Sequence, residues 1–293
     1  MTDGGGMDII ITGLVLGGTY ALIAMGLNLQ YGMARIMNLA NGEVLVVGAF
    51  VAFWLYTAGQ VSPLLTLFVV APLAFALNWL IYRFMLLPLV RRAKSQGQLE
   101  VDSILVTFGL SFVGVGLMLA FFGGDYFSYS YLARPVRIMG ETYGLNRIVA
   151  FLGAVVIGGL LYLWLERTRP GRAMRAIAVD PKSARLVGID VPRMSALAFA
   201  LGGTITAMGG ALLSTYLTLD ASTGVLFTLK ALVIVIMGGV GDLRGTIVAA
   251  LLLGLLETFV AAWIDPGLTL AAAYLLFVLI LLFRPQGLFG RKA

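Results

Sequence analysis

Polar residues within apolar stretches are the first candidates for chemistry in this sequence. Asn38, Asn41 and Glu43 stand close together at the start of one apolar stretch. A carboxylate inside a membrane costs about 2.5–3.5 kcal/mol at the centre of a helix, so it usually faces protein or water. Asn38 and Asn41 are expected to share a helix face, with Glu43 about 140° away. The three residues are candidates for the wall or gate of a polar route, or for an interfacial cap of the helix start.

Side chains that carry catalysis or bind metals are scarce. The chain contains no cysteine and no histidine, so thiolate chemistry, the commonest catalytic base and the commonest metal ligand are missing. None of the four lysines follows a glycine, so the sequence has no phosphate-binding loop of the Walker type. We predict no catalytic residue, no metal site and no ATP site on this chain, and a membrane enzyme is the weakest class considered.

A second group of candidates lies in a basic segment, residues 166–193. Asp180 is a good helix N-cap, and Pro181 suits the first helical position. Gly188 stands where a left-handed residue commonly ends a helix, so the sequence predicts a two-turn helix that begins at Pro181. Ala184 and Gly188 are small and four residues apart, so a partner surface could approach closely there. The alternative is a basic loop that only anchors the topology.

Glycines at four-residue spacing predict close packing between helices. Gly13 with Gly17, and Gly241 with Gly245, have the spacing that lets helix backbones approach each other in lipid. The predicted packing positions are Gly13, Gly17, Gly238, Gly239, Gly241 and Gly245. A weak internal echo links two short basic turns, residues 32–35 and 241–244, and two repeated halves are common in transporters.

Composition predicts a membrane protein built from helices. Of the 293 residues, 60% are apolar and 12% are charged, whereas a soluble domain carries about a quarter charged residues. The apolar runs are not alternating, which disfavours a membrane β-barrel. We therefore expect an all-α polytopic membrane protein, a single transmembrane domain over residues 1–293 with a bundle of about eight or nine spanning helices.

Nine apolar passes are expected. They run near residues 9–29, 36–55, 64–89, 104–122, 148–165, 194–217, 225–237, 246–263 and 268–283. The seventh covers only about 20 Å and is interpreted as a possible re-entrant half-helix, so eight full spans plus one short piece is the alternative. Lys230 and Glu257 are the remaining charges that lie deep or nearly deep in these passes, and Lys230 is expected to snorkel to the interface.

Basic residues predict the orientation. They crowd the loop at residues 91–94, the segment 166–193 and the C-terminus at Arg284, Arg291 and Lys292. Lys and Arg are enriched in cytoplasmic loops, and this explains the net charge of +6 without nucleic acid. Counting passes back from these clusters places the N-terminus outside and the C-terminus inside.

Several motifs resemble one family of membrane proteins. They are residues 17–22 (GGTYAL), 35–43 (RIMNLANGE), 172–181 (RAMRAIAVDP), 188–190 (GID), 238–242 (GGVGD) and 284–288 (RPQGL). The chain resembles the branched-chain amino acid permeases of bacterial ABC importers, the shorter of their two permease types, over nearly its whole length. Asn41 stands where many members of the family carry His.

The resemblance implies a role for each part of the chain. It makes the short helix a coupling helix that docks into an ATPase subunit, with Asp180, Pro181, Ala184, Gly188, Ile189 and Asp190 at the contact. It implies a second homologous permease, two ATPases that bind ATP and Mg²⁺, a periplasmic binding protein and the bacterial inner membrane. The expected solutes are branched-chain amino acids. Urea, short amides or aromatic acids are the alternatives within the family, and a stand-alone channel or secondary transporter is the alternative outside it.

Overall fold

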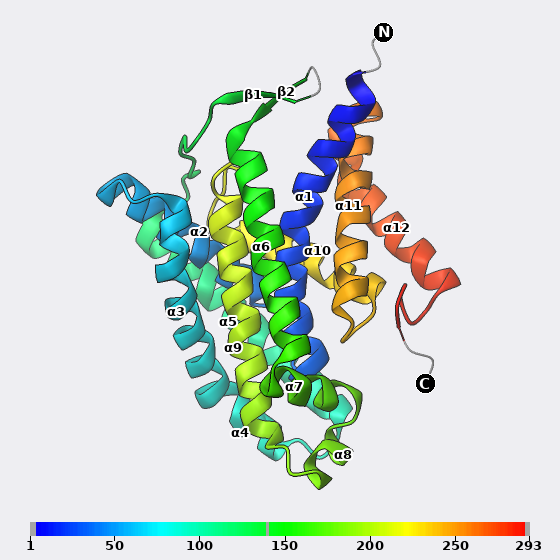
Figure 1. Cartoon of the computed structure of the whole chain (residues 1–293). Helices are drawn as coiled ribbons and strands as arrows, with labels where there is room; N and C mark the ends of the chain where they lie inside the picture. Colours follow the sequence, from blue (N-terminus) through cyan, green and yellow to red (C-terminus); the bar gives the residue numbers. More distant parts are fainter. Residues whose placement is uncertain (1–3, 139–140, 291–293) are drawn as a thin grey trace.

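The structure is a computed structural model that describes residues 4–138 and 141–290. The described chain is a bundle of helices with one small hairpin (Figure 1). The helices are α1 (Gly4–Asn28), α2 (Asn41–Gly59), α3 (Pro63–Ile81), α4 (Leu87–Arg92), α5 (Gln96–Phe122), α6 (Leu145–Arg167), α7 (Arg169–Val179), α8 (Pro181–Leu186), α9 (Val191–Leu213), α10 (Thr223–Gly238), α11 (Leu243–Trp263) and α12 (Thr269–Phe283).

Shorter elements extend or join these helices. The π-helical turn η1 (Leu29–Met33) continues α1, η2 (Tyr82–Leu86) links α3 to α4, and the 3-10 turn η3 (Pro266–Leu268) precedes α12. The strands β1 (Pro135–Ile138) and β2 (Glu141–Gly144) pair antiparallel. Pro88 explains η2. Because proline has no N–H, it cannot donate to the carbonyl of Phe84 four residues earlier, and the helix widens there into a π-helical turn.

Eight helical runs of the described chain are long and apolar enough to cross a membrane. They are residues 8–33, 41–59, 63–92, 97–122, 145–167, 191–213, 243–263 and 266–283. These runs confirm the predicted all-α polytopic fold. α10 has 16 residues, about 24 Å, and is shorter than a hydrocarbon core of about 30 Å.

The hairpin and the arginine-rich helices lie at opposite ends of the bundle. The β1–β2 hairpin lies at one end, and α4, α7 and α8 lie at the other, which we call the basic end (Figure 1). After α9 the chain pairs with the hairpin side, through Leu219 and Phe127. After α10, Gly241 comes close to Ala178 of α7. The segment 219–241 therefore leads from the hairpin side toward the basic end, and α10 is its short helical part, which agrees with the alternative of eight full spans plus one short piece.

Two helices form the centre of the bundle. The apolar stretch of α9 is 83% buried and that of α1 is 67% buried, whereas α5 reaches 11% and α12 only 6%. α1 runs antiparallel to α11, and a Cβ at Gly13 or Gly17 would come within 2.9 Å of Leu255 Cα or 2.8 Å of Leu251 Cα. Gly13 and Gly17 therefore lie where the backbones of two helices meet, as their four-residue spacing predicts.

Candidate functional site

Two helix N-termini meet inside the bundle. α2 begins at Asn41 and α10 at Thr223, and a Cβ added at Gly42 would overlap the carbonyl of Gly224. The backbone N–H of Gly42 donates to Thr228 Oγ1 at 2.8 Å. The N-terminus of a helix carries a partial positive charge, so two of them together favour acceptors and anions nearby.

Glu43 lies in the first turn of α2 at this meeting point. Its Oε1 accepts a hydrogen bond from Ser111 of α5 at 3.0 Å, and its Oε2 is buried with no hydrogen-bond partner among the described residues. A Cβ at Gly114 would lie 3.1 Å from Glu43 Cβ, and one at Gly224 would lie 2.9 Å from Oε2. The side chain is only 4% exposed, so α5 and α10 seal it from solvent.

Asn38 and Asn41 do not share a helix face, and that prediction is wrong. The helix begins only at Asn41, because Asn38 instead forms a local turn in which its Oδ1 accepts from Ala40 N at 3.0 Å. Asn38 Nδ2 donates to Gln30 Oε1 at 2.9 Å. Thr206 of α9 donates to Asn41 Oδ1 at 3.0 Å, and Asn41 Nδ2 is buried without a partner in the described chain. Both asparagines are buried, so a role as pathway wall stays a prediction.

Polar residues that the sequence reasoning missed line this interior. Gln30, Ser111, Thr206 and Thr228 each bind one of the three candidates or the helix start beside them. Thr107 of α5 accepts from the backbone N–H of Leu39 at 3.1 Å. The available signal was the presence of amides and hydroxyls inside apolar passes, with Ser103, Thr107 and Ser111 recurring every four residues.

α8 at the basic end begins as the sequence predicts. The Asp180 carboxylate accepts from Lys182 N at 2.8 Å and from the Ser183 hydroxyl, and Pro181 is the first helical residue. These two hydrogen bonds, that of Ser183 first, hold the pKa of Asp180 below its usual value. The cap is therefore intact above the ordinary pKa of an aspartate and is lost only as the pH falls through the lowered value.

The outer face of α8 differs from the predicted one. Ala184 is 3% exposed and packs against Ile177 and Val191, so it faces its own chain and not a partner. Gly188 has the expected left-handed φ of +81° with nothing within 4 Å of an added Cβ. The exposed apolar side chains are Val179, Leu186 and Val187, at 66%, 88% and 76%. Ile189 is half-buried, and Asp190 caps α9 by accepting from Arg193 N at 3.1 Å.

The glycine-rich turn between α10 and α11 packs tightly. Gly238 and Gly245 approach so closely that a Cβ on either would overlap the other backbone. Gly239 and Gly241 have φ of +109° and +85°, which only glycine adopts without strain. Asn28 of α1 accepts from Gly241 N at 2.7 Å. The two turns of the weak internal echo also touch, because a Cβ on Gly32 would lie 2.5 Å from Gly241 Cα.

The segment after α12 closes the same turn. Leu288 N donates to Met237 O at 2.7 Å, and Phe289 N donates to Gly238 O at 3.1 Å. These donors satisfy two of the carbonyls that the C-terminus of α10 leaves free. The motif at residues 284–288 thus folds back on the short helix. Arg291 and Lys292, two of the basic residues used for the orientation, lie outside the described residues.

Lys230 does not snorkel to the interface, and that prediction is wrong. Its Nζ lies 2.8 Å from Glu257 Oε2 and donates to the Tyr20 hydroxyl at 2.7 Å. The two charged side chains are 12% and 5% exposed. The pair joins α10, α11 and α1, because a partner inside the bundle offsets the desolvation that would otherwise drive the amine outward.

Eight spans around helix N-termini that meet in the interior are the arrangement of a polytopic membrane transport protein. The family model described as "Branched-chain amino acid transport system / permease component" matches residues 9–283. The chain belongs to this family of permease components.

Individual relatives cover nearly the whole chain. The high-affinity branched-chain amino acid transport system permease protein LivH of Salmonella typhimurium is 28% identical over 96% of this chain and 94% of its own. The corresponding protein BraD of Pseudomonas aeruginosa is 29% identical over 96% and 95%. The solved structure of PsaBC from Streptococcus pneumoniae in complex with Fab has a TM-score of 0.50 at 12% identity, covering 97% of this chain and 93% of that one, which is a likeness in fold.

Proposed function

We propose that this chain is the permease subunit of an ATP-driven importer that carries hydrophobic amino acids such as leucine, isoleucine and valine. The observation that carries the proposal is the similarity, over nearly the full length, to LivH and BraD, which are named for branched-chain amino acid transport. In this proposal ATP and Mg²⁺ bind to a partner ATPase, and the chain holds no cofactor of its own.

The proposed ATPase contact is the tip formed by α7 and α8. Val179, Leu186 and Val187 expose apolar surface there beside the exposed arginines of α7. Large apolar side chains exposed at the end of a membrane protein usually contact a partner. Support also comes from the rigidity of the tip, because Asp180 caps α8 and Asp190 caps α9 on either side of it.

The proposed assembly contains two permeases, two ATPases and a periplasmic binding protein. The basic end would then be cytoplasmic and the hairpin end periplasmic, in agreement with the enrichment of Lys and Arg in cytoplasmic loops. This orientation puts the N-terminus in the periplasm and the C-terminus in the cytoplasm of a bacterial inner membrane. The second permease is a homologue of this chain.

The proposed pathway runs past the meeting point of α2 and α10. Asn38, Asn41 and Glu43 are buried there, and in this proposal their burial represents a closed state of the route. Opening requires movement of a helix that covers these residues. We favour α5, because little of its surface is buried and because its Ser111 and Gly114 lie against Glu43. Selectivity would reside largely in the binding protein, whose pocket can enclose the solute.

The test is solute-stimulated ATP hydrolysis and uptake by the complex reconstituted in liposomes with its own binding protein. Leucine, isoleucine or valine should stimulate both activities, and the same liposomes without the ATPase should show no uptake. If urea, a short amide or an aromatic acid drives ATP hydrolysis and leucine does not, the solute is wrong while the importer assignment holds. Uptake without the ATPase would instead favour a channel or secondary transporter.

A further inference from the structure

A groove runs along the outer side of α3 toward the basic end. It encloses about 610 Å³ between α3, the start of α9 and Pro170 of α7. Its apolar lining includes Phe75, Trp79, Leu80 and Leu197. The rings of Phe75 and Trp79 are stacked, with centroids 6.0 Å apart. The volume falls within the roughly 300–1,000 Å³ typical of small-molecule sites.

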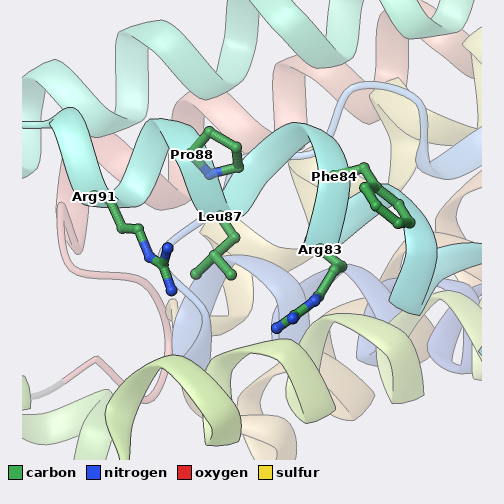
Figure 2. Close-up of a pocket in the computed structure, with 5 residues that line it drawn as sticks. All are labelled: Arg83, Phe84, Leu87, Pro88 and Arg91. Atoms are coloured by element: carbon green, nitrogen blue, oxygen red, sulfur yellow. The ribbon is translucent and has the colours of Figure 1, made fainter.

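A second hollow of about 180 Å³ continues along the same run of helix, with Arg83, Phe84, Leu87, Pro88 and Arg91 as its lining. Figure 2 shows the guanidinium groups of Arg83 and Arg91 on the same side of the helix, with Leu87 between them. In a regular α-helix, residues eight apart differ by about 80° around the axis. The π-helical turn η2 adds about one residue to the turn, which reduces this difference to about 20°.

Three arginines line these two hollows without acidic partners among the described residues. Arg83 and Arg91 line the second hollow, and Arg193 lines the first. All three side chains are exposed, and none has an ion-pair partner among the residues that the structure describes. Guanidinium groups recognise phosphate with paired hydrogen bonds, so the free charges are complementary to a phosphate ester.

The helix surface beside the groove favours an amphiphile over a free anion. Phe68 and Leu73 are 80% and 51% exposed on the same helix before Trp79, as expected of a surface that faces acyl chains. Trp79 lies one helical turn before Arg83, where an aromatic ring marks the boundary between hydrocarbon and headgroups. Apolar surface on one side of that boundary and guanidinium groups on the other match an amphiphile with an anionic head.

We propose that this groove is a binding site for an anionic phospholipid of the leaflet at the basic end. Its phosphate lies between Arg83, Arg91 and Arg193, and an acyl chain lies along Phe75, Trp79 and Leu197. A basic pocket between transmembrane helices is the usual form of such a site. The proposal concerns the lipid and is independent of the transported solute.

The test measures lipid binding to the purified full-length chain in detergent. Phosphatidylglycerol or phosphatidylcholine with the same acyl chains is added. Native mass spectrometry counts the bound lipids, and a separate thermal unfolding experiment gives the melting temperature. Phosphatidylglycerol should bind and raise the melting temperature more than phosphatidylcholine. Arg83→Gln and Arg193→Gln should each weaken its binding about fivefold, the equivalent of about 1 kcal/mol for each basic residue.

Two matched variants separate the site from general effects. Arg137→Gln removes an exposed arginine from β1 at the opposite end, and phosphatidylglycerol binding should not change. Ala76→Trp fills the apolar part of the groove without changing charge, and binding should be lost. The lipid comparison on the unmodified chain needs no variant, so a variant that fails to fold leaves the test intact.

Four results would overturn the proposal. Equal binding of both lipids would remove the role of the arginines, and equal stabilisation by inorganic phosphate would mean an anion site without a lipid. Unchanged phosphatidylglycerol binding in Ala76→Trp would place the lipid elsewhere. A concentration-dependent dimer that Ala76→Trp dissociates would make the groove an interface between copies of this chain.

Discussion

At the residue scale, the few charged side chains inside the bundle depend on named neighbours. Lys230 and Glu257 form a buried pair at 2.8 Å that also binds Tyr20, and the Lys230 amine lies 4.9 Å from the centre of the Tyr20 ring. Glu43 has one bonded and one free oxygen at the junction of α2 and α10. A buried charge that loses its partner destabilises the fold, so single and paired substitutions should change the stability of the chain by very different amounts.

Lys230→Met should destabilise the chain strongly, because it leaves the Glu257 carboxylate buried without a counter-charge. Removing one partner of a buried pair typically costs about 3–5 kcal/mol. The double variant Lys230→Met with Glu257→Gln should recover most of the loss, since no charge is left unpaired. The measurement is the melting temperature in detergent across the double-mutant cycle. Strictly additive losses would show that the two residues do not stabilise each other.

Glu43 and Asn41 should separate assembly from transport. Glu43→Ala removes the oxygen that accepts the hydrogen bond from Ser111. This change should lower the stability of the chain by roughly 1–3 kcal/mol and therefore lower the yield of folded chain, whereas Glu43→Gln keeps an acceptor for Ser111. Asn41→Ala should change the transport rate with the complex intact, because it releases the start of α2 from Thr206. Yield after purification and uptake in liposomes measure the two effects. Normal yield with Glu43→Ala would contradict a packing role for this carboxylate.

At the element scale, the short helices are held by contacts with neighbouring segments of the chain. The 16-residue α10 begins against α2, is linked to α11 by Lys230 and ends under the segment after α12. The six-residue α8 is capped by the adjacent Asp180, and its Ala184 packs against Ile177 and Val191. Helices this short are marginal by themselves, so tertiary contacts at both ends set their positions.

Gly188→Leu should abolish transport while the chain still inserts and the complex still captures the binding protein. The left-handed φ of +81° costs a side chain about 1–2 kcal/mol, and the leucine would project from the proposed ATPase contact, since nothing of this chain lies within 4 Å. Gly188→Asn is the matched control, because asparagine tolerates this conformation and is smaller. Substrate-stimulated ATP hydrolysis is the measurement. Full stimulation in Gly188→Leu would mean that this basic segment only anchors the topology.

At the scale of the whole molecule, the two ends of the bundle differ in charge and surface. The basic end carries α4, α7 and α8 with their arginines, and the opposite end carries the hairpin (Figure 1). Tyr129 and Tyr131, in the segment between α5 and the hairpin, cluster around Tyr56. Aromatic clusters of this kind are typical of a membrane interface. A bundle with such different ends adopts one orientation, and that orientation can be measured directly.

Single cysteines should report the orientation, since the chain has no native cysteine. Ser130 lies between α5 and β1 and Ser183 lies in α8, and both are exposed at opposite ends. A membrane-impermeant maleimide applied to intact cells should label Ser130→Cys and leave Ser183→Cys unlabelled until the membrane is opened. Labelling of Ser183→Cys in intact cells would reverse the assigned orientation.

The sequence by itself determined the class of fold, because apolar runs of spanning length can only be satisfied as helices in a membrane. It also determined the N-cap at Asp180 and the left-handed turn at Gly188, which depend on neighbours a few residues away. Only the tertiary structure decided that Asn38 precedes the helix, that Ala184 faces inward and that Lys230 pairs with Glu257. These outcomes depend on packing against other segments, such as that of Gln30 with Asn38, of Ile177 and Val191 with Ala184, and of Glu257 with Lys230. Local pattern specifies which segments are helical, whereas packing between segments specifies which face of each helix is buried.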